Sequence, residues 1–160
     1  MLYPTEVVMN YLDMAQMYAD QHTDCIKVSV GCALVLRPGT VVFGANRAVN
    51  RSCKTNGCMR VEKYGENSKD HRLPADCNAV HSEVDAITRA ACQGFSTLCA
   101  TAFVTRYPCE ACARALVAAG VSTVYYGRGQ SISDQTEQIF GVNGVQVIHV
   151  KTWNRDDTEV

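Results

Sequence analysis

The fold is decided by two segments, AVHSEVDAITRAAC at residues 79–92 and PCEACARALVAAG at residues 108–120. The pattern of each segment predicts a helix. The first helix would begin after Asn78 as N-cap and end before Gly94, and the second would open on Pro108, at the first-turn position that proline tolerates. Short apolar strands are predicted between the helices at residues 100–105 and after them at residues 121–126. This alternation is typical of an α/β domain.

The flanking sequence extends the alternation in both directions. Residues 5–22 carry apolar side chains at helical spacing, with Thr5 as the expected N-cap. Residues 28–36 and 40–45 favour strands, and the turn-forming residues between them predict a hairpin. A helix over residues 133–140 and a strand over residues 145–150 complete the order α-β-β-α-β-α-β-α-β. We therefore predict a single domain over residues 1–160, an α/β fold whose mixed five-stranded sheet is sandwiched by helices.

The segment at residues 46–78 shows no regular hydrophobic period. Its potential metal ligands are Cys53, Cys58, His71 and Cys77, set among polar residues. A loop of this length is uncommon inside a compact domain unless something orders it. We therefore expect a metal-ordered insertion around residues 46–78.

Composition and charge argue against several classes of protein, namely nucleic-acid binders, membrane proteins and disulfide-rich secreted proteins. The chain has 160 residues, of which 47% are hydrophobic and 19% charged, as in an ordinary globular protein. Its formal net charge of −1 argues against nucleic acid as a partner, since nucleic-acid binders usually carry a basic face. No apolar run approaches a membrane span and no secretory signal is present, so we expect a cytoplasmic protein without a membrane partner. The nine cysteines, an odd number, then indicate metal ligands or buried residues rather than a disulfide framework.

The two predicted helix starts carry residues that suit a metal ion. His81, Cys109 and Cys112 supply three soft ligands, and catalytic zinc keeps three protein ligands with the fourth position left for water. All three are expected in the first turns of their helices, where the helix dipole favours thiolates. Zinc lowers the pKa of a bound water to about 7, and Glu83 is expected to move protons between that water and the substrate. The pattern is the His-x-Glu and Pro-Cys-x-x-Cys signature of zinc deaminases, which remove the amino group of a base such as cytosine as ammonia.

Other interpretations fit parts of this pattern. A Cys-x-x-Cys pair alone also serves structural zinc sites and redox pairs, and a lone His-x-Glu is weaker still. A non-enzymatic zinc scaffold therefore stays an alternative. Glu83 favours catalysis, because a structural site does not need a carboxylate beside it.

From about residue 24 to residue 150 the chain resembles the cytidine deaminase superfamily, most closely its deoxycytidylate (dCMP) deaminase branch. The resemblance is carried by Cys25, residues 30–35, Gly44-Ala45-Asn46, Cys53, Cys58, Cys77, residues 80–87 and residues 104–109. It implies hydrolysis of dCMP to dUMP and ammonia in pyrimidine nucleotide metabolism, which supplies dTMP biosynthesis. The rival substrates are free cytidine or deoxycytidine and a base in RNA. Enzymes for free cytidine usually have Cys in place of His81, and RNA-editing relatives usually have a basic surface and lack the cysteine-rich segment.

The resemblance also assigns substrate-binding residues. Asn46 would lie near the sugar, Tyr126 would line the pocket, and Arg128 would reach the phosphate. Other candidates for the phosphate are Arg60, Lys63, Arg72, Arg106 and Arg114.

Four positions depart from the branch's pattern. Ala45 and Arg47 replace Tyr and Gly around Asn46, Ser82 replaces Ala, and Asp85 replaces Asn. We expect Ser82 to bind a phosphate or to pack. The segment around Asn46 also shapes the site of the regulatory nucleotides dCTP and dTTP, which would bring Mg²⁺, so the departures there bear on regulation. Members of this branch are typically homohexamers.

A second, structural zinc ion is expected in the cysteine-rich segment, as in related members of the branch. Structural sites are closed by four Cys or His ligands. The preferred set is Cys25, Cys53, His71 and Cys77, with Cys58 as the alternate. The remaining cysteines, Cys32, Cys92 and Cys99, stand on apolar elements and are predicted to lie in the core.

Overall fold

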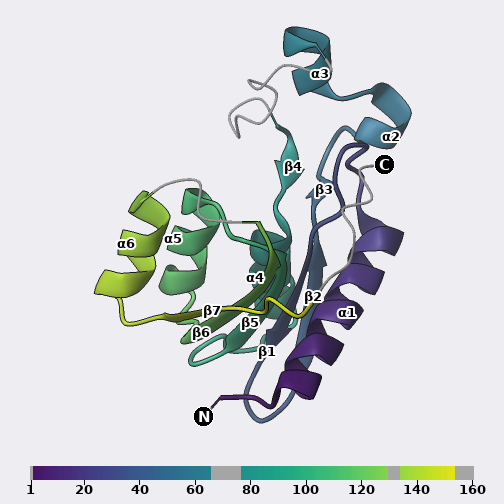
Figure 1. Ribbon diagram of the computed structural model, residues 1–160. Coiled ribbons are helices and arrows are strands. Elements are labelled where there is room, and N and C mark those ends of the chain that lie inside the picture. Colours follow the sequence, from purple (N-terminus) through teal and green to yellow (C-terminus); the bar gives the residue numbers. More distant parts are fainter. Residues whose placement is uncertain (1, 66–76, 130–133, 154–160) are drawn as a thin grey trace.

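The computed structural model (Figure 1) describes residues 2–65, 77–129 and 134–153. In chain order its elements are α1 (Thr5–His22), β1 (Gly31–Val35), β2 (Val41–Ala45), β3 (Arg47–Ala48), α2 (Cys53–Asn56), α3 (Met59–Tyr64), β4 (Ala79–Val80), α4 (Ser82–Cys92), β5 (Thr101–Arg106), α5 (Glu110–Ala118), β6 (Thr123–Arg128), α6 (Asp134–Val142) and β7 (Gln146–His149). Among the helices in these three ranges, none has the length and apolar character that a membrane span requires.

The central sheet has five strands in the order β2-β1-β5-β6-β7. Strand β1 is antiparallel to β2 and β5, whereas β5, β6 and β7 are parallel. The predicted mixed five-stranded sheet is therefore confirmed. Helix α1 covers one face, and α4, α5 and α6 lie against the other (Figure 1).

Two buried clusters fill the spaces between these layers. Side chains alternate between the two faces of a strand, so neighbouring residues of β5 belong to different clusters. Phe103 packs with Leu12 under α1, whereas Val104 packs with Ala86 and Ala113 under α4 and α5. The small side chains of Ala86 and Ala113 let these two helices lie close to the sheet.

Glycine sets the closest approach of helix and strand at two positions. A Cβ atom on Gly31 would stand 2.0 Å from the Ala15 carbonyl oxygen of α1. A Cβ atom on Gly44 would stand 2.1 Å from the Ser82 carbonyl oxygen, at the start of α4. A glycine inside a strand often marks such an approach of another backbone. Gly44 therefore lets the first turn of α4 rest directly on β2.

Helices α4 and α5 begin later than the sequence predicts. Ala79–Val80 form strand β4, which pairs with β3 in a separate two-stranded sheet, so α4 starts only at Ser82. His81 is its N-cap, with extended φ and ψ of −72° and 154°. Helix α5 starts at Glu110, because Cys109 has the extended backbone of an N-cap (φ −74°, ψ 169°). Tertiary pairing and capping thus displaced both predicted helix starts.

The N-cap of α1 also differs from the prediction. Thr5 is the first helical residue, and the cap is Pro4, whose carbonyl oxygen accepts the amide hydrogen of Val8 at 3.0 Å. No side chain caps this helix. The fixed φ of proline suits an extended residue before a helix, which leaves Thr5 inside the first turn.

The segment at residues 46–78 has more regular structure than its sequence indicates. Its described part contains β3 and two short helices, α2 and α3, which project beyond the end of the central sheet, and it leads into β4 (Figure 1). Ser52 caps α2 by accepting the amide hydrogen of Lys54 at 3.2 Å. These helices are too short to show a hydrophobic period, which is why the sequence pattern missed them. His71 lies outside the described residues.

The three cysteines assigned to the core have different environments. Cys32 is fully buried in β1, as predicted. Cys92 and Cys99 are exposed, so that part of the prediction is wrong. Cys92 is the last residue of α4, and Cys99 has a positive φ of 58° in the loop before β5. Both stand where the chain leaves the core.

Candidate active site

Three predicted metal ligands meet where α4 and α5 begin. The ligand atoms of His81, Cys109 and Cys112 all lie within 4.8 Å of one another. The His81 Nδ1 atom is 3.5 Å from the Cys109 Sγ atom and 3.3 Å from the Cys112 Sγ atom. Tetrahedral zinc, with bonds of about 2.1 Å to nitrogen and 2.3 Å to sulfur, separates such atoms by about 3.6 Å. The donor types and their spacing therefore fit zinc.

The two helices aim their N-termini at this cluster. His81 and Cys109 are the N-caps of α4 and α5, and their carbonyl oxygens accept the amide hydrogens of Asp85 at 2.9 Å and Ala113 at 2.8 Å. The sequence predicts both residues inside the first turn, whereas each stands one step before it. At that position the unpaired N–H groups and the positive end of the helix dipole favour a thiolate.

Hydrogen bonding distributes charge unequally between the two thiols. The pKa of Cys109 is lowered to about 4, chiefly because the Cys112 thiol donates to its sulfur and His81 adds a second bond. The pKa of Cys112 is raised for the matching reason, since ionising it would break its bond to Cys109. The pKa of His81 is raised by its bond to Cys109, against the effect of burial. The folded chain thus favours a thiolate at Cys109, and a metal ion bound there would displace the protons that remain on the other ligands.

Glu83 is a buried carboxyl group at the same cluster. Its side chain is 4% exposed, and burial raises its pKa above the ordinary value. Its Oε2 atom accepts a hydrogen bond from the Ser82 hydroxyl at 3.1 Å. The Cys112 side chain also interacts with Glu83, and this contributes to the raised pKa of the thiol. A buried carboxyl group whose pKa is raised holds a proton more readily than an exposed one, which suits a group that passes protons on.

Ser82 packs in the interior. It is fully buried under β2, and its hydroxyl donates to Glu83. Of the two roles expected for Ser82, packing is the one that this burial fits.

Asn46 is bound into the fold. Its Oδ1 atom accepts hydrogen bonds from the Thr23 hydroxyl at 2.9 Å and the Val30 amide at 2.8 Å, and its Nδ2 atom donates to the Val28 carbonyl oxygen at 2.9 Å. These bonds tie the chain before β1 to the end of β2. Contact of Asn46 with a substrate sugar stays a prediction.

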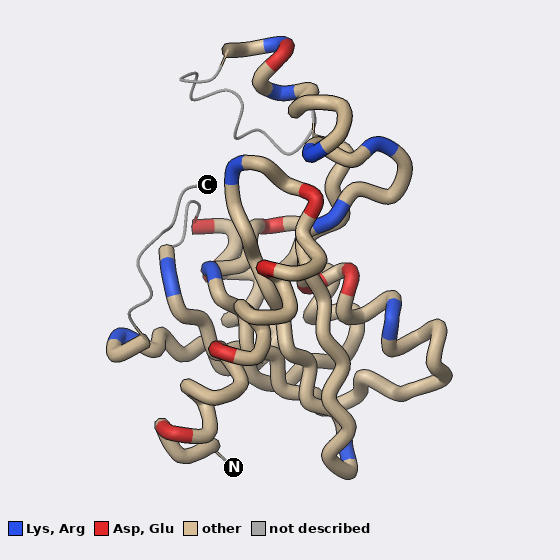
Figure 2. The backbone as a smooth tube through the Cα atoms, turned by 90° about the vertical axis from the view of Figure 1, so that its right-hand side faces the viewer, with Lys and Arg blue, Asp and Glu red and all other residues tan. Residues whose placement is uncertain are grey.

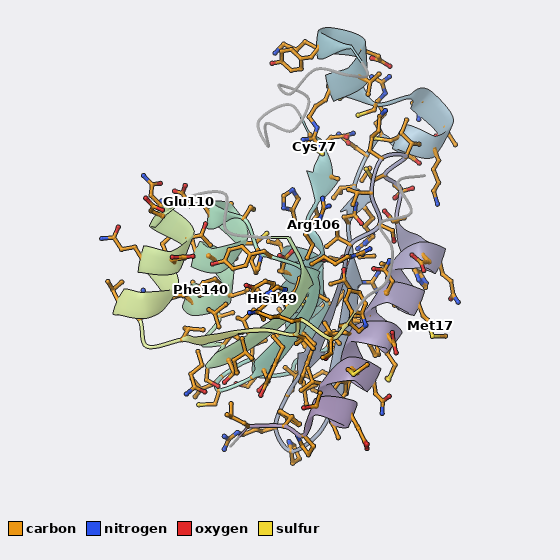
Figure 3. The ribbon with its side chains drawn as sticks, viewed as in Figure 1. Met17, Cys77, Arg106, Glu110, Phe140 and His149 are labelled. Atoms are coloured by element: carbon orange, nitrogen blue, oxygen red, sulfur yellow. The ribbon has the colours of Figure 1, made fainter. Side chains whose placement is uncertain are left out.

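Tyr126 lines a cavity beside α6. Its ring stacks on His149 at 4.5 Å and meets Tyr107 edge-on at 4.7 Å between ring centroids. Burial raises the pKa of its hydroxyl. The cavity has a volume of about 300 Å³ and is lined by Tyr107, Tyr126, Glu137, Phe140, Gly141, Val145 and Val147. Phe140 projects from α6 toward the sheet at this point (Figure 3), and the zinc-type ligands are not part of the lining.

Arg128 is engaged on the α1 side of the sheet. Its guanidinium group donates to the Gln16 Oε1 atom at 2.7 Å and lies over the Trp153 ring at 5.3 Å. Both contacts hold the arginine to α1 and to the chain after β7. Its role in binding a phosphate stays a prediction.

Four cysteines gather around α2. Burial raises the pKa of Cys53 to about 11, and the neighbouring Cys58, Cys25 and Cys77 raise it further. Cys77 lies just before β4, at the end of the molecule that carries α2 and α3 (Figure 3). Within residues 2–65, 77–129 and 134–153, only the His81 group brings three ligand atoms within 4.8 Å, so the four cysteines are spread more widely. Cys58, the alternate ligand, thus belongs to this cluster.

Sequence reasoning missed one network beside the site. Asp85 is buried and accepts hydrogen bonds from Arg47 and Arg89. The signal for it was present, because Arg47 and Asp85 are two of the four departures from the branch's pattern. Only the fold brings the two positions together.

A mixed sheet that carries a His, Cys and Cys cluster and a buried carboxyl group at two helix starts is the arrangement of the zinc-type deaminases. Residues 8–159 match the MafB19-like deaminase family, so the chain belongs to that family. The fold and the site are therefore those of a deaminase domain of the cytidine deaminase superfamily.

Individual relatives agree with this assignment. The chain is 31% identical to the deoxycytidylate deaminase of Mycobacterium phage D29 over 110 residues, which cover 68% of this chain and 84% of the relative. It is 28% identical to ComE operon protein 2 of Bacillus subtilis (strain 168) over 129 residues, 79% of this chain but 62% of that protein. The crystal structure of the cyanophage S-TIM5 dCMP deaminase in complex with dCMP and dUMP has a TM-score of 0.68 and 22% identity, and it covers 93% of this chain and 99% of the other. The last similarity establishes the fold.

Proposed function

We propose that the chain hydrolyses dCMP to dUMP and ammonia, supplying dUMP for dTMP biosynthesis. The observation that carries the proposal is the cluster of His81, Cys109 and Cys112 with the buried carboxyl group of Glu83 beside it. The named activity of the phage D29 relative and the dCMP and dUMP in the S-TIM5 complex support the choice of substrate.

In this proposal His81, Cys109 and Cys112 hold zinc, which would supply an activated water when bound. Glu83 would take one proton of the attacking water at a carboxylate oxygen and deliver it to the ring nitrogen. It would then carry the remaining hydroxyl proton to the amino group, which leaves as ammonia. The Ser82 hydroxyl holds that carboxylate in place through its 3.1 Å hydrogen bond. Burial of Glu83 keeps bulk water from competing for the proton.

Two features support a mononucleotide over the rival substrates. The first metal ligand is His81, whereas deaminases of free cytidine usually have Cys there. Lys and Arg are also intermingled with Asp and Glu along the described backbone (Figure 2), which fits poorly with a long RNA. Assembly into a homohexamer and control by dCTP or dTTP with Mg²⁺ belong to the same proposal.

Ammonia release from dCMP, deoxycytidine and CMP, assayed side by side with the zinc-loaded protein, tests the proposal. Turnover of dCMP well above that of the two others is the expected result. Preference for deoxycytidine would refute the nucleotide substrate. An inactive protein with full zinc content would instead favour the scaffold alternative.

We also propose a second, structural zinc ion held by Cys25, Cys53, Cys77 and Cys58. The shared effect of three neighbouring sulfurs on the Cys53 thiol supports this set. Cys58, the alternate of the predicted set, here replaces His71 because, of the three sulfurs, Cys58 has the largest effect on the Cys53 thiol. Zinc analysis of Cys58→Ser and His71→Ala proteins separates the two choices, because only the true ligand's variant should lose one zinc ion per chain.

A further inference from the structure

Asp85 is the centre of a buried ionic network on α4. Asp85 is 1% exposed, yet its carboxylate accepts three hydrogen bonds and makes a further ion-pair contact. The Oδ1 atom accepts from the Nε atom of Arg47 at 2.8 Å, and the Arg47 Nη2 atom also lies 2.8 Å from it. The Oδ2 atom accepts from the Nε atom of Arg89 at 3.0 Å and from the Ala45 amide at 3.1 Å. A buried carboxylate needs such partners, and removing one of them is costly.

Arg47 is attached to both ends of the segment that carries His81 and Glu83. Its backbone pairs with Val80, the residue directly before His81, in the β3–β4 ladder. Its guanidinium group binds Asp85, two residues beyond Glu83. The Asp85 amide in turn donates to the His81 carbonyl oxygen at 2.9 Å. The segment from Val80 to Asp85 is therefore bracketed by one residue of another strand.

We propose that Arg47 and Asp85 are positioning residues that hold His81 and Glu83 in the geometry that deamination requires. This inference rests on the proposed catalytic roles of those two residues. Arginine suits the task because its rigid fork fixes both the distance and the direction of the carboxylate, whereas lysine is a flexible point charge. Arg47 and Asp85, two of the four residues that depart from the branch's pattern, thus form one ion pair between β3 and α4.

Arg89 provides a matched control. It binds the same carboxylate at a similar distance, but from within α4, in an i,i+4 pair. Its other contact is with the Tyr18 ring of α1, at 5.7 Å, and not with β3. Both arginines are about one-third exposed. Replacing either arginine removes one cation from Asp85. Only replacement of Arg47 breaks the side-chain link between β3 and α4.

The test compares Arg47→Gln with Arg89→Gln in dCMP turnover, with Tm and zinc content measured in parallel. Loss of an outer partner of a metal site typically costs about 10–100-fold, so Arg47→Gln should lower kcat by that factor with KM nearly unchanged. Arg89→Gln should lower Tm to a similar extent while kcat stays near the wild-type value. Arg47→Lys should recover part of the lost kcat. Equal losses of kcat in the two glutamine variants, or a change confined to KM, would overturn the inference.

A double variant examines the pairing itself. If Arg47 acts through Asp85, then Arg47→Gln combined with Asp85→Asn should have a kcat no lower than that of the worse single variant. Losses that multiply would contradict action through Asp85.

Cobalt substitution separates this inference from the proposed function. The d–d absorption bands of cobalt at the His81 site, taken as a difference from Cys109→Ser protein, report ligand geometry without turnover. Arg47→Gln should shift these bands and Arg89→Gln should not, whatever substrate the enzyme uses. Unchanged bands in Arg47→Gln would overturn the positioning role. Failure of wild-type protein to deaminate dCMP would refute the proposed function but leave this comparison valid.

Discussion

The chain has two cysteine clusters, one at the starts of α4 and α5 and one around α2, and they shift the pKa of a cysteine thiol in opposite directions. At the helix starts, a donated hydrogen bond lowers the pKa of Cys109 to about 4. In the cluster around α2, burial among other sulfurs raises the pKa of Cys53 to about 11. The first cluster stands at the starts of two core helices beside a buried carboxyl group. The second joins α2 and the start of α3 to loop residues before β1 and β4. The difference matches the two proposals, a catalytic site at the helix starts and a structural zinc site around α2.

The largest expected effect comes from Glu83→Gln. The substitution keeps the shape of the side chain but removes the proton carrier, so dCMP turnover should fall by about 10²–10⁴-fold. Ammonia release measures the loss, while Tm and zinc content should stay at the wild-type level. If this variant kept its activity, the cluster at the helix starts would have to be a structural zinc site, like the one proposed around α2.

Thiol alkylation tests the opposite pKa shifts directly. At neutral pH the metal-free protein should hold Cys109 as thiolate and Cys53 as thiol, because pH 7 lies above the first pKa and below the second. Only the thiolate reacts, so iodoacetamide should modify Cys109 faster by about 100-fold or more. Mass spectrometry of peptides after brief exposure gives both rates. The rate at Cys53 should rise steeply as the pH approaches 11, and comparable rates at pH 7 would remove the contrast.

Cys53→Ser should act on stability more than on chemistry. Loss of the proposed structural zinc should remove one zinc ion per chain and lower Tm by about 10 °C, since this size of protein loses a few degrees per kcal/mol. Metal analysis and thermal unfolding measure the two effects. The exposed Cys99 provides the control variant, Cys99→Ser, which should change neither. Unaltered zinc content in Cys53→Ser would refute the second site.

The smallest effect is expected from Gly44→Ala. The new Cβ atom would meet the Ser82 carbonyl oxygen and push α4 away from β2, at a cost of about 1–3 kcal/mol. Urea unfolding measures this cost, and kcat should fall as well because Glu83 moves with α4. Gly31→Ala imposes a similar clash under α1 and should destabilise the protein with less effect on kcat. Equal losses of kcat in the two variants would contradict the expectation that displacing α4, which carries Glu83, affects catalysis more than displacing α1.

The sequence predicted the order of the core elements because their periodicity is strong. The mixed sheet and the deaminase family follow from patterns such as the long apolar stripe of α1 and the two ligand segments. Boundaries were less accurate where a tertiary contact competed with local preference. Val80 joined a strand because Arg47 lies opposite it, and no local pattern near Val80 indicates that partner.

By itself, the sequence determined which side chains could hold a metal ion, since ligand type and the spacing of Cys109 and Cys112 at one helix start are local properties. Only the tertiary structure decided what surrounds them. The gathering of Cys25, Cys53, Cys58 and Cys77 spans more than fifty residues of chain, and the pairing of Arg47 with Asp85 spans 38. Such contacts form because folding brings distant segments to one end of a sheet. A charge that is buried there is costly unless it is paired with an opposite charge. The local sequence pattern therefore indicates which residues can bind a metal ion, and tertiary packing decides which residues position them.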